Sequence, residues 1–91
     1  MKEFTEFTLP ALPYPADALE PYYDQQTVKI HHDMHHAGYV KGLNVAFKKL
    51  EEARDSGDFS LIKHWEREMA FHGAGHWFHT MFWENMRPGK E

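Results

Sequence analysis

The sequence contains no cysteine, which excludes disulfide bonds, zinc–thiolate sites and iron–sulfur clusters. It has no apolar run near the ~20 residues that a membrane-spanning helix needs, so we expect no membrane partner. No basic patch accompanies the formal net charge of −4, and we therefore expect no nucleic-acid partner. The polar opening "MKEFTEF" is followed by no apolar run, so no signal peptide is visible and we expect a cytoplasmic location.

Motifs for several common chemistries are missing as well. There is no GxSxG stretch for a serine nucleophile, no HExxH pattern for a zinc hydrolase and no glycine loop for phosphate. The His-x-x-Glu spacing of carboxylate-bridged di-iron bundles is also absent. What the chain does have in excess is histidine and aromatic side chains.

The aromatic content is large for so short a chain. Its 91 residues form one small domain, yet they include three Trp, four Tyr and seven Phe. A small helical protein has little interior in which to bury so many rings. Some of them are therefore expected to contact another domain or another chain.

The pattern of prolines, caps and apolar residues predicts an all-α protein. Four of the five prolines lie near the start of the chain, where they forbid a continuous helix. Asp24 is a suitable N-cap, and Gly57 suits the left-handed position that closes a helix. We therefore predict a long antiparallel two-helix hairpin preceded by a Pro-rich extended N-terminal arm. The predicted ranges are 1–23 for the arm, 24–54 for the first helix and 58–86 for the second, within a single domain 1–91.

Four of the eight histidines fall within six positions of the stretch "TVKIHHDMHHAGYVKGLN". His31 and His35 lie four residues apart on the apolar stripe of the first predicted helix, so we expect them to face the second helix. His32 and His36 share the neighbouring flank, for which we expect a solvated, polar environment.

Three further histidines, His72, His76 and His79, recur at helical spacing on the inward stripe of the second predicted helix. Each buried imidazole needs partners for both ring nitrogens, which is difficult to arrange for five of them on facing helices. A metal ion satisfies one nitrogen of each ligand histidine. The pattern therefore predicts a metal site, although no Asp or Glu lies on the inward stripe near His31 or His79 to complete a set of four ligands.

The arm, the doubled histidines and the end of the second helix together resemble a known family. The stretches "LPALPYPADALEPYYDQQTVKIHHDMHHAGYVKGLN" and "GAGHWFHTMFW" are similar to the N-terminal α-hairpin domain of the iron/manganese superoxide dismutases. The resemblance extends from Leu9 to about Arg87. It implies the activity of that family, in which one iron or manganese ion per complete site converts superoxide into dioxygen and hydrogen peroxide.

The resemblance also implies roles for individual residues. His31 and His79 correspond to the metal ligands that the family carries on its two helices. His35 and Tyr39 correspond to residues that surround the metal and line the substrate funnel. Trp83 corresponds to a tryptophan of the aromatic shell around the metal.

The family's other two protein ligands, an aspartate and a histidine, come from an α/β C-terminal domain. The resemblance therefore implies that such a domain is the partner of this chain and that the chain alone is inactive. Two positions depart from the family pattern: Phe78 stands where asparagine is common, and Gly75 stands where some members have glutamine. The resemblance does not distinguish iron from manganese.

A second interpretation is a non-catalytic helical module that self-associates. Two hairpins that dock their aromatic stripes would form a four-helix bundle, and two-fold symmetry is the commonest way to do so. Such a homo-oligomer would bring two His31/His79 pairs together in a symmetric four-histidine metal site. The mass of the chain in solution and its metal content distinguish the two interpretations.

Overall fold

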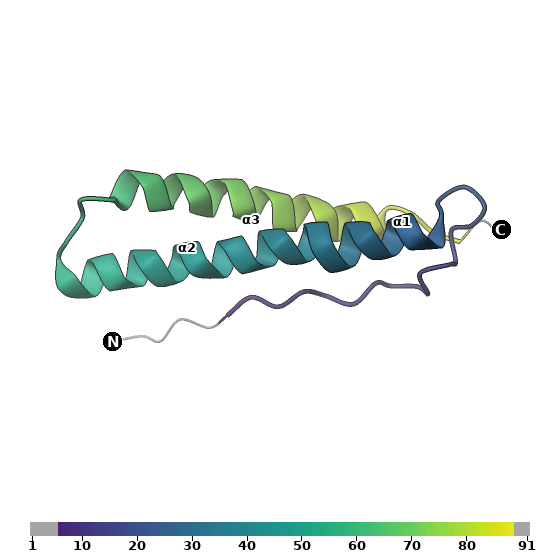
Figure 1. Ribbon diagram of the computed structural model, residues 1–91, viewed down its shortest axis with the longest axis horizontal. Helices are drawn as coiled ribbons and strands as arrows, with labels where there is room; N and C mark the ends of the chain where they lie inside the picture. Colours follow the sequence, from purple (N-terminus) through teal and green to yellow (C-terminus); the bar gives the residue numbers. More distant parts are fainter. Residues whose placement is uncertain (1–5, 89–91) are drawn as a thin grey trace.

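A computed structural model describes residues 6–88 as a long helical hairpin (Figure 1). The helices α1 (Gln25–Ile30), η1 (His31–His36) and α2 (Ala37–Ser56) follow one another without a break, and α3 (Ile62–Glu84) returns alongside them. The resulting body measures 54 × 22 × 18 Å. Residues 6–88 contain no strand. The prediction of an all-α, antiparallel two-helix hairpin is therefore confirmed.

Local capping interactions explain where the helices begin and end. The Asp24 carboxylate accepts a hydrogen bond from the backbone N–H of Thr27 at 3.2 Å, which caps α1. Gly57 closes α2 in the left-handed conformation, with φ of 76°. The loop that follows bonds to itself, because the Ser60 N–H donates to the Asp58 carboxylate at 3.1 Å. That local bond delays α3, which begins at Ile62.

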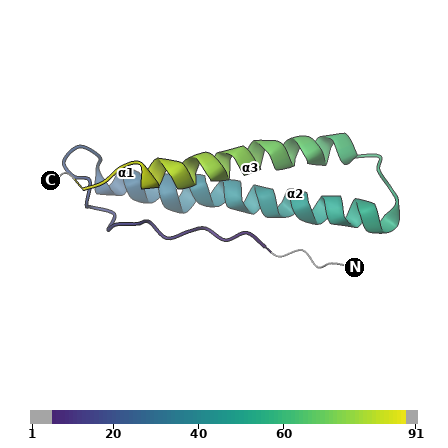
Figure 2. The ribbon, with the colours of Figure 1, turned by 180° about the vertical axis from the view of Figure 1, so that it is seen from behind.

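The segment before α1 runs alongside the first rod of the hairpin, which is the continuous helix formed by α1, η1 and α2, as both views show (Figures 1 and 2). Asn44 on α2 holds the backbone of Phe7 by two hydrogen bonds, of 2.8 and 2.9 Å. The Tyr14 hydroxyl donates to the carbonyl of Trp83 on α3 at 2.9 Å. The Glu20–Pro21 peptide bond is cis. The segment thus contacts both long helices.

The helix around the doubled histidines is π-helical, and this changes which of them are buried. The buried side chains of the first rod are Val28, His32, His36, Val40, Leu43, Ala46 and Leu50. They recur every four residues through η1, because a π-helix bonds residue i to i+5 and holds more residues per turn than an α-helix. The expectation of a solvated flank at His32 and His36 is therefore wrong, since these side chains are 8% and 0% exposed. His35, expected to face inward, is exposed.

Two glycines allow the helices to approach each other closely. A Cβ atom at Gly75 of α3 would overlap the ring of Tyr39 on α2, and one at Gly42 of α2 would overlap the ring of His72 on α3. Each helix therefore receives one ring of the other where it lacks a side chain.

None of the helices in residues 6–88 has the length and apolar character required to cross a membrane.

Candidate metal centre

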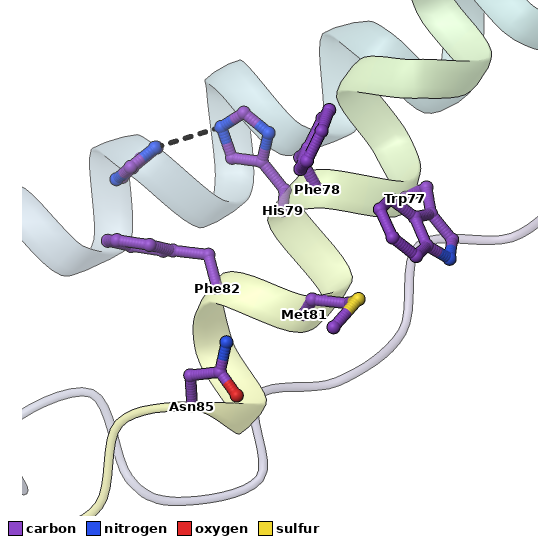
Figure 3. A pocket seen from close by; sticks show the side chains of 7 residues that line it. Trp77, Phe78, His79, Met81, Phe82 and Asn85 are labelled. Atoms are coloured by element: carbon purple, nitrogen blue, oxygen red, sulfur yellow. Dashed lines mark hydrogen bonds between the residues drawn. The ribbon is translucent and has the colours of Figure 1, made fainter.

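The structure brings His31 and His79 together, although they lie 48 positions apart in the sequence. His31 is the first residue of η1, and His79 lies in the second half of α3. Their Nε2 atoms are 2.9 Å apart, and the two rings are nearly perpendicular, at 87°. The dashed line in Figure 3 marks this contact at the His79 ring. Two imidazole nitrogens therefore converge on one point between the helices.

The outer nitrogen of each ring also has a partner. His79 Nδ1 lies 2.7 Å from the carbonyl oxygen of Gly75, which can only accept, so the proton is on Nδ1 and the lone pair is on Nε2. His31 Nδ1 lies 2.6 Å from the hydroxyl of Tyr23. Histidines that bind metals have such partners on the ring nitrogen that faces away from the metal. The donor set of this pair therefore fits a metal ion bound through both Nε2 atoms.

The surroundings of His31 favour the neutral form of its ring. Burial lowers the pKa of His31, and the neighbouring rings of His79 and His35 lower this pKa further. A metal ion binds only the neutral imidazole, because the proton and the metal compete for the same lone pair. The surroundings of His31 therefore favour the form that can bind a metal.

Sequence reasoning also placed His35 and Tyr39 near the metal. Their rings lie close to the pair, since His35 is 6.0 Å from His31 and Tyr39 is 5.2 Å from His79, centroid to centroid. Both residues line an open cavity of about 350 Å³ together with the histidine pair. The complete lining is Thr27, Ile30, His31, His35, Tyr39 and His79. A small molecule can therefore reach the pair from solvent along this side.

A second cavity, of about 410 Å³, adjoins the same pair on the α3 side (Figure 3). Its lining is His31, Trp77, Phe78, His79, Met81, Phe82 and Asn85. The lining contains no Asp, Glu, Lys or Arg side chain. Trp77 and Phe78 are 57% and 62% exposed. This side of the pair is therefore an open apolar surface.

A second imidazole pair, which sequence reasoning did not identify, lies beside the first. Trp83 Nε1–H donates to His36 Nδ1 at 3.2 Å, so His36 carries its proton on Nε2 and donates to His76 Nδ1 at 2.8 Å. Burial is the main cause that lowers the pKa of His36 to about 4, and the adjacent His76 ring contributes to this decrease. The His36 ring lies 5.4 Å from that of His79. His76 Nδ1 accepts this bond, so the neutral His76 ring carries its proton on Nε2, and the second pair packs against the candidate site without offering a free lone pair.

Tyr23 is the other residue that sequence reasoning missed. It precedes the first helix, so helical periodicity says nothing about its position relative to His31. The one available signal is its place two residues after Pro21, at the end of the arm.

The described part of the chain holds an incomplete set of ligands. Within residues 6–88, no group of three or more His, Cys, Asp or Glu side chains could hold a metal ion. The histidine pair alone supplies fewer ligands than the four or more of a stable redox-metal site.

The fold and the site define a histidine-rich α-hairpin in which two imidazole nitrogens from facing helices meet at one point. Residues 6–87 match the family profile described as iron/manganese superoxide dismutases, alpha-hairpin domain. The chain belongs to the iron/manganese superoxide dismutase family through this domain.

Several relatives show the same relationship. The chain is 52% identical to the probable iron superoxide dismutase of Bacillus subtilis (strain 168), over 88% of this chain and 28% of that protein. It is 51% identical to the manganese/iron superoxide dismutase of Propionibacterium freudenreichii subsp. shermanii, over 90% and 41%. For the iron superoxide dismutase of Methanothermobacter marburgensis the identity is 47%, over 99% and 44%. The chain thus spans less than half the length of these relatives.

Proposed function

We propose that this chain is the α-hairpin half of a superoxide dismutase site and that His31 and His79 supply two of its four protein ligands. The observation that carries the proposal is the 2.9 Å approach of the two Nε2 atoms. The names of the relatives support iron or manganese as the metal. When bound, such an ion supplies the reversible one-electron chemistry that turns superoxide into dioxygen and hydrogen peroxide.

The residues of the open cavity have separate tasks in this proposal. His31 and His79 hold the metal position, with their outer nitrogens fixed by Tyr23 and Gly75. Tyr39 lines the cavity beside His79, where its hydroxyl can donate a proton to a reduced oxygen species. His35 is exposed at the same cavity, where a ring N–H can donate a hydrogen bond to the superoxide anion.

The remaining ligands and the cover of the apolar surface come, in this proposal, from an α/β C-terminal domain. Two facts support it: the described residues hold too few ligands for one metal, and the chain spans 41% of a relative that carries the whole activity in its name. Superoxide is then the substrate of the completed site. The chain alone is expected to have little or no dismutase activity.

A chimera tests this function directly. Residues 6–87 replace the matched segment of the Propionibacterium freudenreichii protein, and dismutase activity and bound iron or manganese are measured. We expect an active, metal-loaded chimera whose His31→Ala and His79→Ala variants lose both properties. His64→Ala, an exposed histidine at the other end of α3, is the matched control and keeps both. Activity and metal content that survive both ligand substitutions would contradict the proposal, as would full activity of the chain alone.

The exposed aromatic side chains favour a second candidate function, that of a self-associating helical module. Phe71, Trp77 and Phe78 all lie on α3, and each is more than half exposed. A symmetric partner that covers them would place two His31/His79 pairs near each other. Light scattering combined with metal analysis of the purified chain tests this alternative. A metal-free monomer would exclude it.

A further inference from the structure

Tyr23 reaches the candidate metal centre from outside the hairpin. Its hydroxyl lies 2.6 Å from Nδ1 of His31. Its ring packs against Trp83, at 6.5 Å and 29° between planes, and meets Phe82 edge-on at 6.3 Å. These contacts with α3 hold the ring in place, so the direction of the hydroxyl is determined by packing.

The hydrogen bonds around the pair determine where each proton lies when both rings are neutral. His79 Nδ1–H donates to the Gly75 carbonyl, so His79 Nε2 can only accept. The 2.9 Å contact therefore requires His31 Nε2–H to donate to His79 Nε2. His31 Nδ1 is then without a proton and accepts from the Tyr23 hydroxyl.

Metal binding through both Nε2 atoms demands a different proton arrangement on one ring only. His79 already presents a lone pair on Nε2, whereas His31 must move its proton from Nε2 to Nδ1. The partner of His31 Nδ1 must then accept a hydrogen bond where it previously donated one. A backbone carbonyl serves only the second arrangement, but a hydroxyl both donates and accepts, and it serves the two arrangements equally.

We propose that Tyr23 is a positioning residue for His31: its hydroxyl orients the ring and accepts the Nδ1 proton that His31 carries when Nε2 binds a metal. The inference rests on the proposed function insofar as it takes His31 to be a ligand. It adds a residue of the arm to a site otherwise built from the two long helices. Phenylalanine at this position keeps the ring contacts but provides neither donor nor acceptor.

Two measurements on the full chain test the role of Tyr23. The ring-nitrogen NMR signals of His31 report which nitrogen carries the proton, without any metal. Titration with Cu²⁺ alone, the divalent probe with the highest affinity for imidazole, reports the affinity of the pair. Copper bound at the pair is identified as the part of the binding that His79→Ala removes.

Tyr23→Phe is expected to shift the His31 signals towards a mixture of the two neutral tautomers. It is also expected to weaken Cu²⁺ binding at the pair about 10- to 100-fold, as loss of a ligand's outer hydrogen bond does in other sites. Tyr14→Phe is the matched control, because it removes a hydroxyl of similar burial that bonds to the Trp83 carbonyl and to no histidine. Tyr22→Phe, at a side chain that is 90% exposed, is the second control. Both controls are expected to leave the His31 signals and the affinity unchanged.

The outcomes separate this inference from the proposed function. Tyr23→Phe with the tautomer and affinity of Tyr14→Phe overturns the role of Tyr23, while the loss of binding in His79→Ala still supports the metal pair. Copper binding that neither His31→Ala nor His79→Ala weakens contradicts the proposed function and, with it, the metal part of this inference. Circular dichroism of each variant establishes that the helices remain folded.

Discussion

Histidines that are neighbours in this sequence differ in their exposure to solvent and in their hydrogen bonds. His36 is completely enclosed and donates to His76, whereas His35, one position earlier, is exposed at a cavity. The sequence predicts that histidines on facing helices gather, because their helical spacing is regular. It does not reveal which ring nitrogen finds which partner, since Tyr23 and Trp83 supply those partners from other elements.

The enclosed histidines predict how stability depends on pH. Burial lowers the pKa of His36 from 6.5 to about 4 and also lowers the pKa values of His31 and His76. As the pH falls below ~6.5 the unfolded chain takes up these protons first, so the free energy of unfolding decreases until the folded chain is protonated as well. Urea unfolding of the full chain is therefore expected to give a lower stability at about pH 5 than at about pH 7.

A matched pair of variants attributes this effect to the buried ring. His36→Gln removes the titrating group, so the difference in stability between the two pH values is expected to shrink. His64→Gln, at an exposed position of α3, is expected to leave the difference as it is. Equal stability of the parent chain at both pH values would show that these rings titrate alike in the folded and unfolded chain.

At the level of the helices, apolar periodicity predicts the hairpin well and the identity of its inner face less well. Val28, Leu43 and Leu50 are buried as a regular helix requires. The prediction is wrong across η1, because regular 3.6-residue spacing does not anticipate a π-helical segment. His32 is buried for a further reason, since its Nε2 donates to the carbonyl of Pro10 in the arm, at 2.7 Å. A pattern read along one helix cannot detect such a cover.

The contact between α2 and α3 predicts opposite effects for two glycine substitutions. A methyl group at Gly75 overlaps the Tyr39 ring, so Gly75→Ala is expected to displace that ring and destabilise the fold by about 1–3 kcal/mol. Nothing lies within 4 Å of a Cβ atom at Gly38, so Gly38→Ala is expected to stabilise the helix by roughly 0.5–1 kcal/mol. Urea unfolding of both variants measures the two changes. A neutral Gly75→Ala would show that Tyr39 moves aside at no cost.

At the level of the whole molecule, the exposed rings of α3 predict an apolar surface that binds other apolar molecules but contributes little to the free energy of unfolding. Phe78 is 62% exposed beside the apolar cavity. Phe78→Ser is expected to lower the binding of a hydrophobic dye and any self-association of the chain. The free energy of unfolding is expected to change by less than about 0.5 kcal/mol, as for other surface positions. Trp83→Ser is the contrasting variant, because Trp83 is 2% exposed and its loss is expected to destabilise the fold strongly.

Dye fluorescence and light scattering measure the surface effect, and urea unfolding measures the stability of both variants. Dye binding that Phe78→Ser leaves unchanged would show that the dye binds elsewhere on the chain.

The two glycine contacts between the long helices also determine how far one helix can slide along the other. The ring of Tyr39 sits over Gly75 and the ring of His72 sits over Gly42, so each helix carries one projection and one notch. A slip of one helical turn, about 5.4 Å, would move the ring of Tyr39 from Gly75 to Phe71 or His79, and both of these positions carry large side chains. The same slip would separate the Nε2 atoms of His31 and His79. The packing at these two glycines therefore favours a single axial register of the hairpin. In that register the two imidazoles meet.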